Sequence, residues 1–183
     1  MVVHYEYCPQ CGRKLADRNS GEDGMIPYCD SCQKFWFDSF DSCVIILTYN
    51  EFNEIVMTRQ PHLTNEHWVY TSGFINPGES AEHAAIREVK EELGLDILSV
   101  ENAGTYWFAK GGMLMHAFIG YAKKRDFTLS EEVEEAVWVD VRKAAELAGP
   151  VRPNVADFSM MANFAKSHNV CDPDELWPGQ KIE

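Results

Sequence analysis

The sequence predicts an α/β domain preceded by a small N-terminal metal-binding module. From Ser42 onward, short apolar strand patterns are mixed with a few helical patterns, which is typical of a layered α/β domain. Before that point, residues 1–37 contain four of the six cysteines, several turn residues and no helical periodicity. A chain of 183 residues can hold one ordinary domain and a small appendage. We therefore expect the module over residues 1–37 and the α/β domain over residues 38–183.

The N-terminal cysteines form two Cys-x-x-Cys pairs, Cys8 with Cys11 and Cys29 with Cys32. Each pair can lie on a tight turn that directs two thiolates at one point, and Gly12 suits the positive φ of such a turn. Disulfides and a redox motif are the alternatives. Disulfides fit poorly with a chain that lacks an export signal, and one redox motif would not need a duplicate. We expect one structural Zn²⁺ bound by the four thiolates, with no ligand position left open for catalysis.

Strand patterns of the larger domain follow one another along the chain. The first two are joined across Asn50–Asn53 and predict a β-hairpin. In order, the patterns cover Cys43–Tyr49, Glu54–Arg59, His67–Thr71, Ile97–Phe108, Met113–Ala122 and Ala136–Val139.

Three helical patterns are expected between and after these strands. Ser80 is a suitable N-cap for a helix that runs to Leu93, and Gly94 is a suitable residue to end it. Shorter helices fit Val141–Leu147 and Asn154–Ser167. Few helices among many strands again favour the layered α/β class.

The helix after Ser80 carries an unusual set of carboxylates. At about 100° per residue, Glu91 and Glu92 lie about 60° to one side and about 40° to the other side of Glu88, so the three share one face. Oxygen-rich anionic clusters of this kind suit Mg²⁺ or Mn²⁺. Arg87 falls on the neighbouring face, within reach of Glu79 in the preceding loop. An ordinary solvated acidic face is the alternative.

Composition and charge exclude several function classes. Sixteen Lys and Arg against 29 Asp and Glu give a formal net charge of −13. Such a surface repels DNA, RNA and anionic membranes. The longest apolar run, Cys43–Leu47, is too short to span a bilayer, and Met1–Gln10 lacks the layout of a secretory signal. We expect a cytoplasmic protein whose partner is neither DNA nor a membrane, with RNA binding disfavoured.

The segment from Gly73 to Leu95 has the pattern G-x5-E-x7-R-E-U-x-E-E-x-G-U, in which U is apolar. It resembles the box of the Nudix family at every fixed position. The resemblance implies a Nudix-type α/β/α sandwich behind the zinc ribbon. In that family the box forms a loop–helix–loop that holds metal ions against a diphosphate.

The resemblance also implies roles for individual residues. Glu88, Glu91 and Glu92 are similar to the family's carboxylate ligands for Mg²⁺ or Mn²⁺, and the Ser72 carbonyl is similar to its backbone ligand. Glu88 or Glu91 is the expected catalytic base. Glu79 and Arg87 resemble the structural ion pair of the family.

A branch of the family typified by NADH pyrophosphatases also has two Cys-x-x-Cys pairs directly before the hydrolase domain. The stretch Cys32–Ile46 aligns with that branch without gaps. The segment from Glu132 to Trp138 resembles its E-x-x-E-A-x-W motif, which implies that Glu132 is an additional metal ligand. The alternative is that Glu132 is one more charge in an acidic run.

One departure from that branch concerns its substrate marker, S-Q-P-W-P-F-P-x-S. The matching stretch, Thr105–Met113, has aromatic residues and none of the prolines, and Asp38 and Ser42 replace two further prolines. Aromatic rings suit a nucleobase or nicotinamide, although core packing is the more common role of any single ring. The candidates are Phe74, Tyr106, Trp107 and Phe108.

The expected reaction is substitution by water at phosphorus, which breaks a P–O–P bridge in a small nucleoside diphosphate derivative. By resemblance, the favoured substrates are NAD(H)-type dinucleotides, which would give a mononucleotide and AMP. An ADP-ribose or nucleoside-triphosphate pyrophosphatase is one alternative, and a non-catalytic zinc-ribbon binding or regulatory module is another. The branch also implies a possible homodimer.

Overall fold

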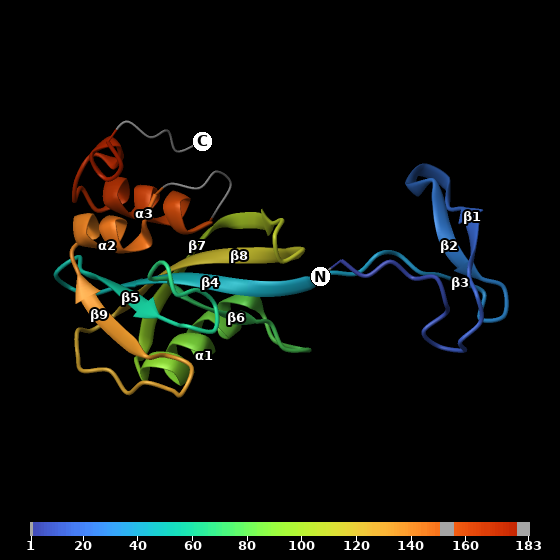
Figure 1. The fold of residues 1–183 in the computed structure, drawn as a ribbon, viewed down its shortest axis with the longest axis horizontal. Coiled ribbons are helices and arrows are strands. Elements are labelled where there is room, and N and C mark those ends of the chain that lie inside the picture. Colours follow the sequence, from blue (N-terminus) through green and yellow to red (C-terminus); the bar gives the residue numbers. More distant parts are fainter. Residues whose placement is uncertain (1, 151–155, 179–183) are drawn as a thin grey trace. The chain divides into compact units, whose positions relative to one another are not determined.

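A computed structural model describes residues 2–150 and 156–178 (Figure 1). The chain divides into two compact units. One consists of Met1–Asp41 with Lys110–Met113, and the other of Ser42–Ala109 with Leu114–Glu183.

The first unit is built on a small antiparallel sheet of three strands, β1 (Ala16–Asn19), β2 (Met25–Cys29) and β3 (Lys34–Phe35). Tyr28 pairs with Ala16 on one side and with Phe35 on the other. The Tyr28 and Phe35 rings meet edge to face at 4.8 Å, and the Arg18 guanidinium lies 3.7 Å from the centre of the Tyr28 ring. These contacts supply the apolar packing that so short a sheet needs.

The second unit contains a sheet of six described strands. In sheet order, β7, β8, β4, β5 and β9 lie side by side, and β6 pairs with β4 along its first half. The strand bounds are β4 (Asp41–Tyr49), β5 (Ile55–Arg59), β6 (Thr71–Phe74), β7 (Ile97–Phe108), β8 (Met113–Ala122) and β9 (Glu135–Val139).

Helices cover both faces of this sheet. α1 (Ala81–Leu93) lies on one face, and α2 (Val141–Ala148) and α3 (Ala156–Ser167) lie on the other (Figure 1). Successive side chains of a strand point to opposite faces. On β4, Val44 and Ile46 accordingly pack in the core with α1, whereas Ile45 and Leu47 pack in the core with α2 and α3. The expected α/β/α sandwich is confirmed.

Most expected elements appear within two residues of their predicted ends, including the hairpin across Asn50–Asn53. The prediction of a strand over His67–Thr71 is wrong. Val69 makes only an isolated bridge with Thr58, and the chain then changes partner, so that β6 begins at Thr71 against β4. The start of the helix expected from Asn154 lies outside the described residues.

Within the described residues, no helix is long and apolar enough to cross a membrane.

Candidate functional site

Helix α1 is held at both ends by local interactions. The Ser80 hydroxyl accepts a hydrogen bond from the backbone N–H of His83 at 3.3 Å, which satisfies one of the free donors of the first turn. Gly94 ends the helix with φ 71°, a left-handed conformation that suits glycine. The predicted cap, length and stop of this helix are confirmed. The helix therefore presents its carboxylates from a fixed position above the sheet.

An ion pair ties the preceding loop to this helix. Arg87 Nε donates to Glu79 Oε1 at 2.8 Å, and Arg87 Nη2 donates to Glu79 Oε2 at 2.9 Å. The same guanidinium reaches the carbonyl of Phe74 at 3.0 Å. The bidentate contact with Arg87 is the main cause that lowers the pKa of Glu79 to about 2. Loop and helix are therefore joined by charge-assisted hydrogen bonds.

Glu88 lies directly against the backbone of β6. A Cβ added at Gly73 would overlap with the Glu88 carboxylate, so any other residue there would displace this side chain from its present position. The Glu88 side chain is 13% exposed and accepts a hydrogen bond from Arg87 Nη1 at 2.7 Å. Burial raises the pKa of Glu88, against the lowering effect of Arg87.

Glu92 is the most deeply placed carboxylate of the helix, with only 3% of the residue exposed. Its Oε2 accepts a hydrogen bond from Gln60 Nε2 at 2.7 Å. Burial, followed by the charge of Glu88, raises the pKa of Glu92 to about 8, whereas Gln60 lowers it. A buried acid next to another acid is costly unless a proton or a cation neutralises it.

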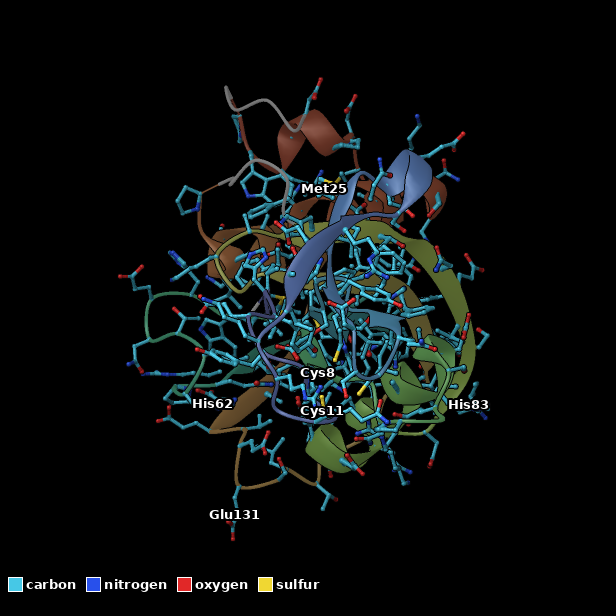
Figure 2. All side chains as sticks on the ribbon, turned by 90° about the vertical axis from the view of Figure 1, so that its right-hand side faces the viewer. Cys8, Cys11, Met25, His62, His83 and Glu131 are labelled. Carbon is cyan, nitrogen blue, oxygen red and sulfur yellow. The ribbon has the colours of Figure 1, made fainter. Side chains whose placement is uncertain are left out.

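Glu91 and Glu132 are exposed, unlike Glu88 and Glu92. Arg87 Nη1 donates to Glu91 at 2.9 Å. Glu132 lies close enough for its charge to raise the pKa of both Glu88 and Glu92. Figure 2 shows the neighbouring Glu131 pointing away from the body of the protein. Within the acidic run, Glu132 is thus a residue whose charge acts on both Glu88 and Glu92.

The backbone ligand implied by the resemblance, Ser72, lies in β6 opposite Ile45 of β4. Its neighbour Gly73 is the residue against which Glu88 packs. The Ser72 carbonyl and the carboxylates of Glu88, Glu91, Glu92 and Glu132 are hard oxygen donors that carry several negative charges. Such a set fits Mg²⁺ or Mn²⁺. Arg87, which contacts both Glu88 and Glu91, compensates part of this charge in the described structure.

The four N-terminal cysteines meet at one point. Their Sγ atoms all lie within 4.8 Å of one another, and Figure 2 shows Cys8 and Cys11 close together. Cys8 and Cys32 are 3.9 Å apart and Cys11 and Cys29 are 3.6 Å apart, far beyond the S–S bond length of about 2.05 Å. All four thiols are free, and together they could hold a metal ion.

Each Cys-x-x-Cys pair is followed by a residue with a positive φ angle. Gly12 follows the first pair with φ 72°, as its position predicts. The residue after the second pair, Gln33, also has a positive φ, 51°. Burial raises the pKa of the Cys8 thiol, but hydrogen bonds from the backbone of Cys11 and Gln10 lower it overall to about 6. The thiolate, which is the form that binds metal, is therefore favoured at Cys8, whereas a hydrogen bond with Cys11 and burial raise the pKa of Cys32 to about 12.

The candidate aromatic residues do not form one group. Phe74 and Trp107 are 57% and 44% exposed. Tyr106 instead packs against the core formed with α2 and α3, and its hydroxyl donates to the Ala103 carbonyl at 3.2 Å. Phe108 is half-buried at the end of β7. The contacts of Tyr106 are those of a core residue.

Two cavities occur away from these rings. One of about 230 Å³ is lined by Arg59, Asn65, Glu66, His67 and Trp68. Another of about 590 Å³ lies near the C-terminus, around residues 166–174. None of the four candidate aromatic residues and none of the box carboxylates lines either cavity.

A sequence model of the NUDIX domain matches residues 40–160, which is more than half of the chain. The chain belongs to the Nudix family. The match covers the whole box and the Glu132 segment, and the predicted family membership is confirmed.

The curated relatives of this Nudix chain include several proteins named NAD-capped RNA hydrolase NudC. The one from Pseudomonas fluorescens strain Pf-5 is 30% identical over 92% of this chain and 59% of its own length. The one from Vibrio atlanticus is 27% identical over 81% of this chain and 54% of its own length. Nudix hydrolase 19 of Arabidopsis thaliana is 30% identical over 78% of this chain and 35% of its own length. The chain therefore spans about a third to three fifths of these relatives.

Solved structures show the same fold. A Nudix hydrolase from Nitrosomonas europaea superimposes with a TM-score of 0.67 at 18% identity, over 92% of this chain and 95% of that one. The Nudix domain of Shewanella oneidensis NrtR, solved with ADP ribose, gives a TM-score of 0.58 at 14% identity, over 78% of this chain and 94% of that one. At these identities the similarity concerns the fold of the Nudix domain.

Sequence reasoning missed two buried polar residues next to the box, Gln60 and Thr71. Both are almost fully buried, at 1% and 2% exposed, and both affect the pKa of Glu92. Gln60 follows an apolar strand and resembles an ordinary loop residue in the sequence. The only signal is that it continues the alternation of Val56 and Thr58, which places it on the α1 face.

Proposed function

We propose that this Nudix protein is a metal-dependent pyrophosphatase that hydrolyses the P–O–P bridge of nucleoside diphosphate derivatives. The observation that carries the proposal is the position of Glu88 and Glu92. One is packed against Gly73, the other is buried, and the like charge of Glu132 acts on both. Such a group of acids is costly by itself and suits a divalent cation.

The residues that would hold Mg²⁺ or Mn²⁺ are those that match the family pattern: Ser72 through its carbonyl, Glu88, Glu91, Glu92 and Glu132. When bound, the metal ions neutralise the diphosphate and lower the pKa of water. Glu79 and Arg87 act at a distance from the reaction, because their bidentate pair fixes the loop between β6 and α1 onto α1.

The catalytic base is proposed to be Glu88 or Glu91. A base works best when its pKa lies near the working pH. Burial raises the pKa of Glu88 in that direction, whereas Glu91 is exposed and more accessible to a water molecule. Replacing Glu88 or Glu91 with Gln and comparing the pH–rate profiles of the two variants separates these candidates. The fall in rate at low pH, which reflects protonation of the base, should persist only in the variant that still has the base.

The cysteine cluster is proposed to hold one structural Zn²⁺ through Cys8, Cys11, Cys29 and Cys32. Four sulfur ligands close the coordination sphere, so this metal contributes to folding and leaves no position for substrate. A ribbon of this kind before the Nudix domain also supports the assignment to the zinc-ribbon branch.

The favoured substrate is an NAD(H)-type dinucleotide, which would be split into a mononucleotide and AMP. The name shared by the NudC relatives, NAD-capped RNA hydrolase, supports a nicotinamide dinucleotide end. The net charge of −13 opposes strong affinity for the RNA backbone. We therefore propose the free dinucleotide as substrate in preference to capped RNA.

Preference among such substrates is expected to be weak. The branch's proline marker is absent, and the turn between β7 and β8 contains Gly111 and Gly112 instead. Proline would fix φ near about −65°, whereas Gly112 has φ 59°. A turn without proline should discriminate less sharply between the groups beyond the diphosphate, so ADP-ribose remains an alternative substrate.

A substrate panel tests the proposal. Purified protein with Mg²⁺ or Mn²⁺ is assayed on NADH, NAD⁺, ADP-ribose, FAD, diadenosine triphosphate and deoxynucleoside triphosphates. We expect hydrolysis of NADH, with at least one other ADP-X compound within about tenfold in kcat/KM, a gap of about 1.4 kcal/mol. A thousandfold preference for NADH would contradict the weak discrimination. Hydrolysis of nucleoside triphosphates alone would contradict the dinucleotide assignment, and no hydrolysis at all would favour a binding module.

A further inference from the structure

We propose that Gln60, which lies outside the Nudix box, is a positioning residue that fixes the carboxylate of Glu92 for metal binding. The inference rests on the proposed function, because it concerns the same metal site. Gln60 is the first residue after β5. The other residues of the site lie in β6, in α1 and in the loop before β9.

Gln60 is placed by the sheet, one residue beyond the end of β5. Val56 packs in the core with α1, and Thr58 and Gln60 follow it at intervals of two, so all three point to the α1 face. Thr58 is fully buried and Gln60 is 1% exposed. The side chain of Gln60 thus reaches Glu92 from below the helix.

The hydrogen bonds of Gln60 fix which end of its amide faces Glu92. Thr58 Oγ1 donates its proton to the Val69 carbonyl at 2.9 Å, so toward Gln60 this oxygen can only accept. Gln60 Nε2 lies 3.3 Å from Thr58 Oγ1 and 2.7 Å from Glu92 Oε2. The NH₂ group therefore serves two acceptors, and the amide is anchored through Thr58 to the backbone of Val69.

Glu92 has few other groups to hold it. Thr71, in β6, lies close to Glu92 and lowers its pKa, but its hydroxyl has no partner within hydrogen-bonding geometry. In the described part of the chain, Gln60 is the one side chain that donates a hydrogen bond to Glu92 within that geometry. Because Oε2 already accepts from Gln60, Oε1 is the more open oxygen for a cation.

A carboxylate fixed in this way loses less conformational freedom when metal binds. Groups that orient a metal ligand typically change metal affinity by about 10-fold to 100-fold when they are removed. A residue that only fills the core would instead change stability and leave metal affinity as it is. Metal affinity therefore distinguishes a positioning role from a purely structural one.

The structure offers a matched pair of variants on adjacent strands. Thr58→Val removes the hydroxyl that anchors Gln60. Thr48→Val removes a hydroxyl that is equally buried, lies on the same face of the sheet and has no hydrogen-bond partner among the described residues. Both changes replace a buried hydroxyl with a methyl group, but only Thr58→Val also removes the hydrogen bonds with Gln60 and with the Val69 carbonyl.

The experiment measures Mn²⁺ binding by electron paramagnetic resonance of free Mn²⁺, using the full chain with its cysteine site loaded with zinc. We expect Gln60→Leu to weaken Mn²⁺ binding by at least about tenfold, and Thr58→Val to weaken it by a smaller factor. Thr48→Val should bind Mn²⁺ as wild type does. At saturating Mn²⁺, Gln60→Leu should recover most of its turnover.

Two results would overturn the inference. The first is a folded Gln60→Leu protein that binds Mn²⁺ within twofold of wild type. If Gln60→Leu does not fold, the second is that Thr58→Val and Thr48→Val bind Mn²⁺ with equal affinity. If the proposed metal-dependent function itself is wrong, the result is distinguishable from both of these. Wild type and Glu92→Gln would then bind Mn²⁺ equally, or neither protein would bind it. That result would remove the metal site and the role of Gln60 together.

Discussion

The three glutamates of α1 share one face of the helix but differ in depth. Glu92 is 3% exposed, Glu88 packs against Gly73, and Glu91 is exposed. Spacing along a helix predicts the common face, because the rotation per residue is constant. It cannot predict depth, which depends on Gln60 and on strands brought in from elsewhere in the chain.

The raised pKa of Glu92 predicts a pH-dependent stability of the protein without divalent metal. An unfolded glutamate titrates near about 4.3, whereas burial raises the pKa of Glu92 to about 8. The folded state therefore holds this proton more tightly than the unfolded state. The stability that it contributes is complete below about pH 4 and is lost as the pH rises through about 8.

Glu92→Gln should remove that dependence. Between about pH 5 and about pH 9, wild type should lose on the order of 3 kcal/mol of unfolding free energy relative to Glu92→Gln. Urea unfolding at several pH values, without Mg²⁺ or Mn²⁺ and with zinc retained, measures this difference. Glu91→Gln is the control, because Glu91 is exposed and its variant should follow the wild-type profile. Parallel profiles for wild type and Glu92→Gln would contradict the burial argument.

Helices and strands whose determinants are local lie where the sequence predicts them. α1 begins after Ser80 and ends before Gly94, as the capping rules for those residues require. The strand expected over His67–Thr71 failed because its pairing is not local. Val69 bridges to Thr58, whereas Thr71 pairs with Ile46 of a different strand. No pattern within those five residues indicates this change of partner.

The ribbon around β2 is the element whose stability should depend most on metal. Its sheet is short, and the four cysteine sulfurs lie within 4.8 Å of one another. We expect one zinc per chain by elemental analysis of protein purified without chelator, and loss of that zinc in Cys29→Ser. Cys171→Ser is the matched control and should retain full zinc. Wild type without zinc, or unchanged zinc in Cys29→Ser, would contradict the assignment.

For the whole molecule, the sequence predicted the fold class and the family, since the box and the cysteine pairs are contiguous motifs. It could not predict how the aromatic residues are distributed. Tyr106 lies against the core with α2 and α3, while Phe74 is exposed at the end of β6. An aromatic ring can serve in a core or at an exposed surface, and only the packing of the complete domain separates the two cases.

In the proposed reaction, water attacks phosphorus and breaks the P–O–P bridge. Hydrolysis of NADH with Mg²⁺ in H₂¹⁸O, followed by mass spectrometry, tests this step. We predict equal amounts of AMP and reduced nicotinamide mononucleotide, with one ¹⁸O atom in one of the two monophosphates and none in the other. Turnover should fall by at least about 10²-fold in Glu88→Gln. Release of nicotinamide with intact ADP-ribose, unlabelled monophosphates, or unchanged turnover in Glu88→Gln would contradict the proposed reaction.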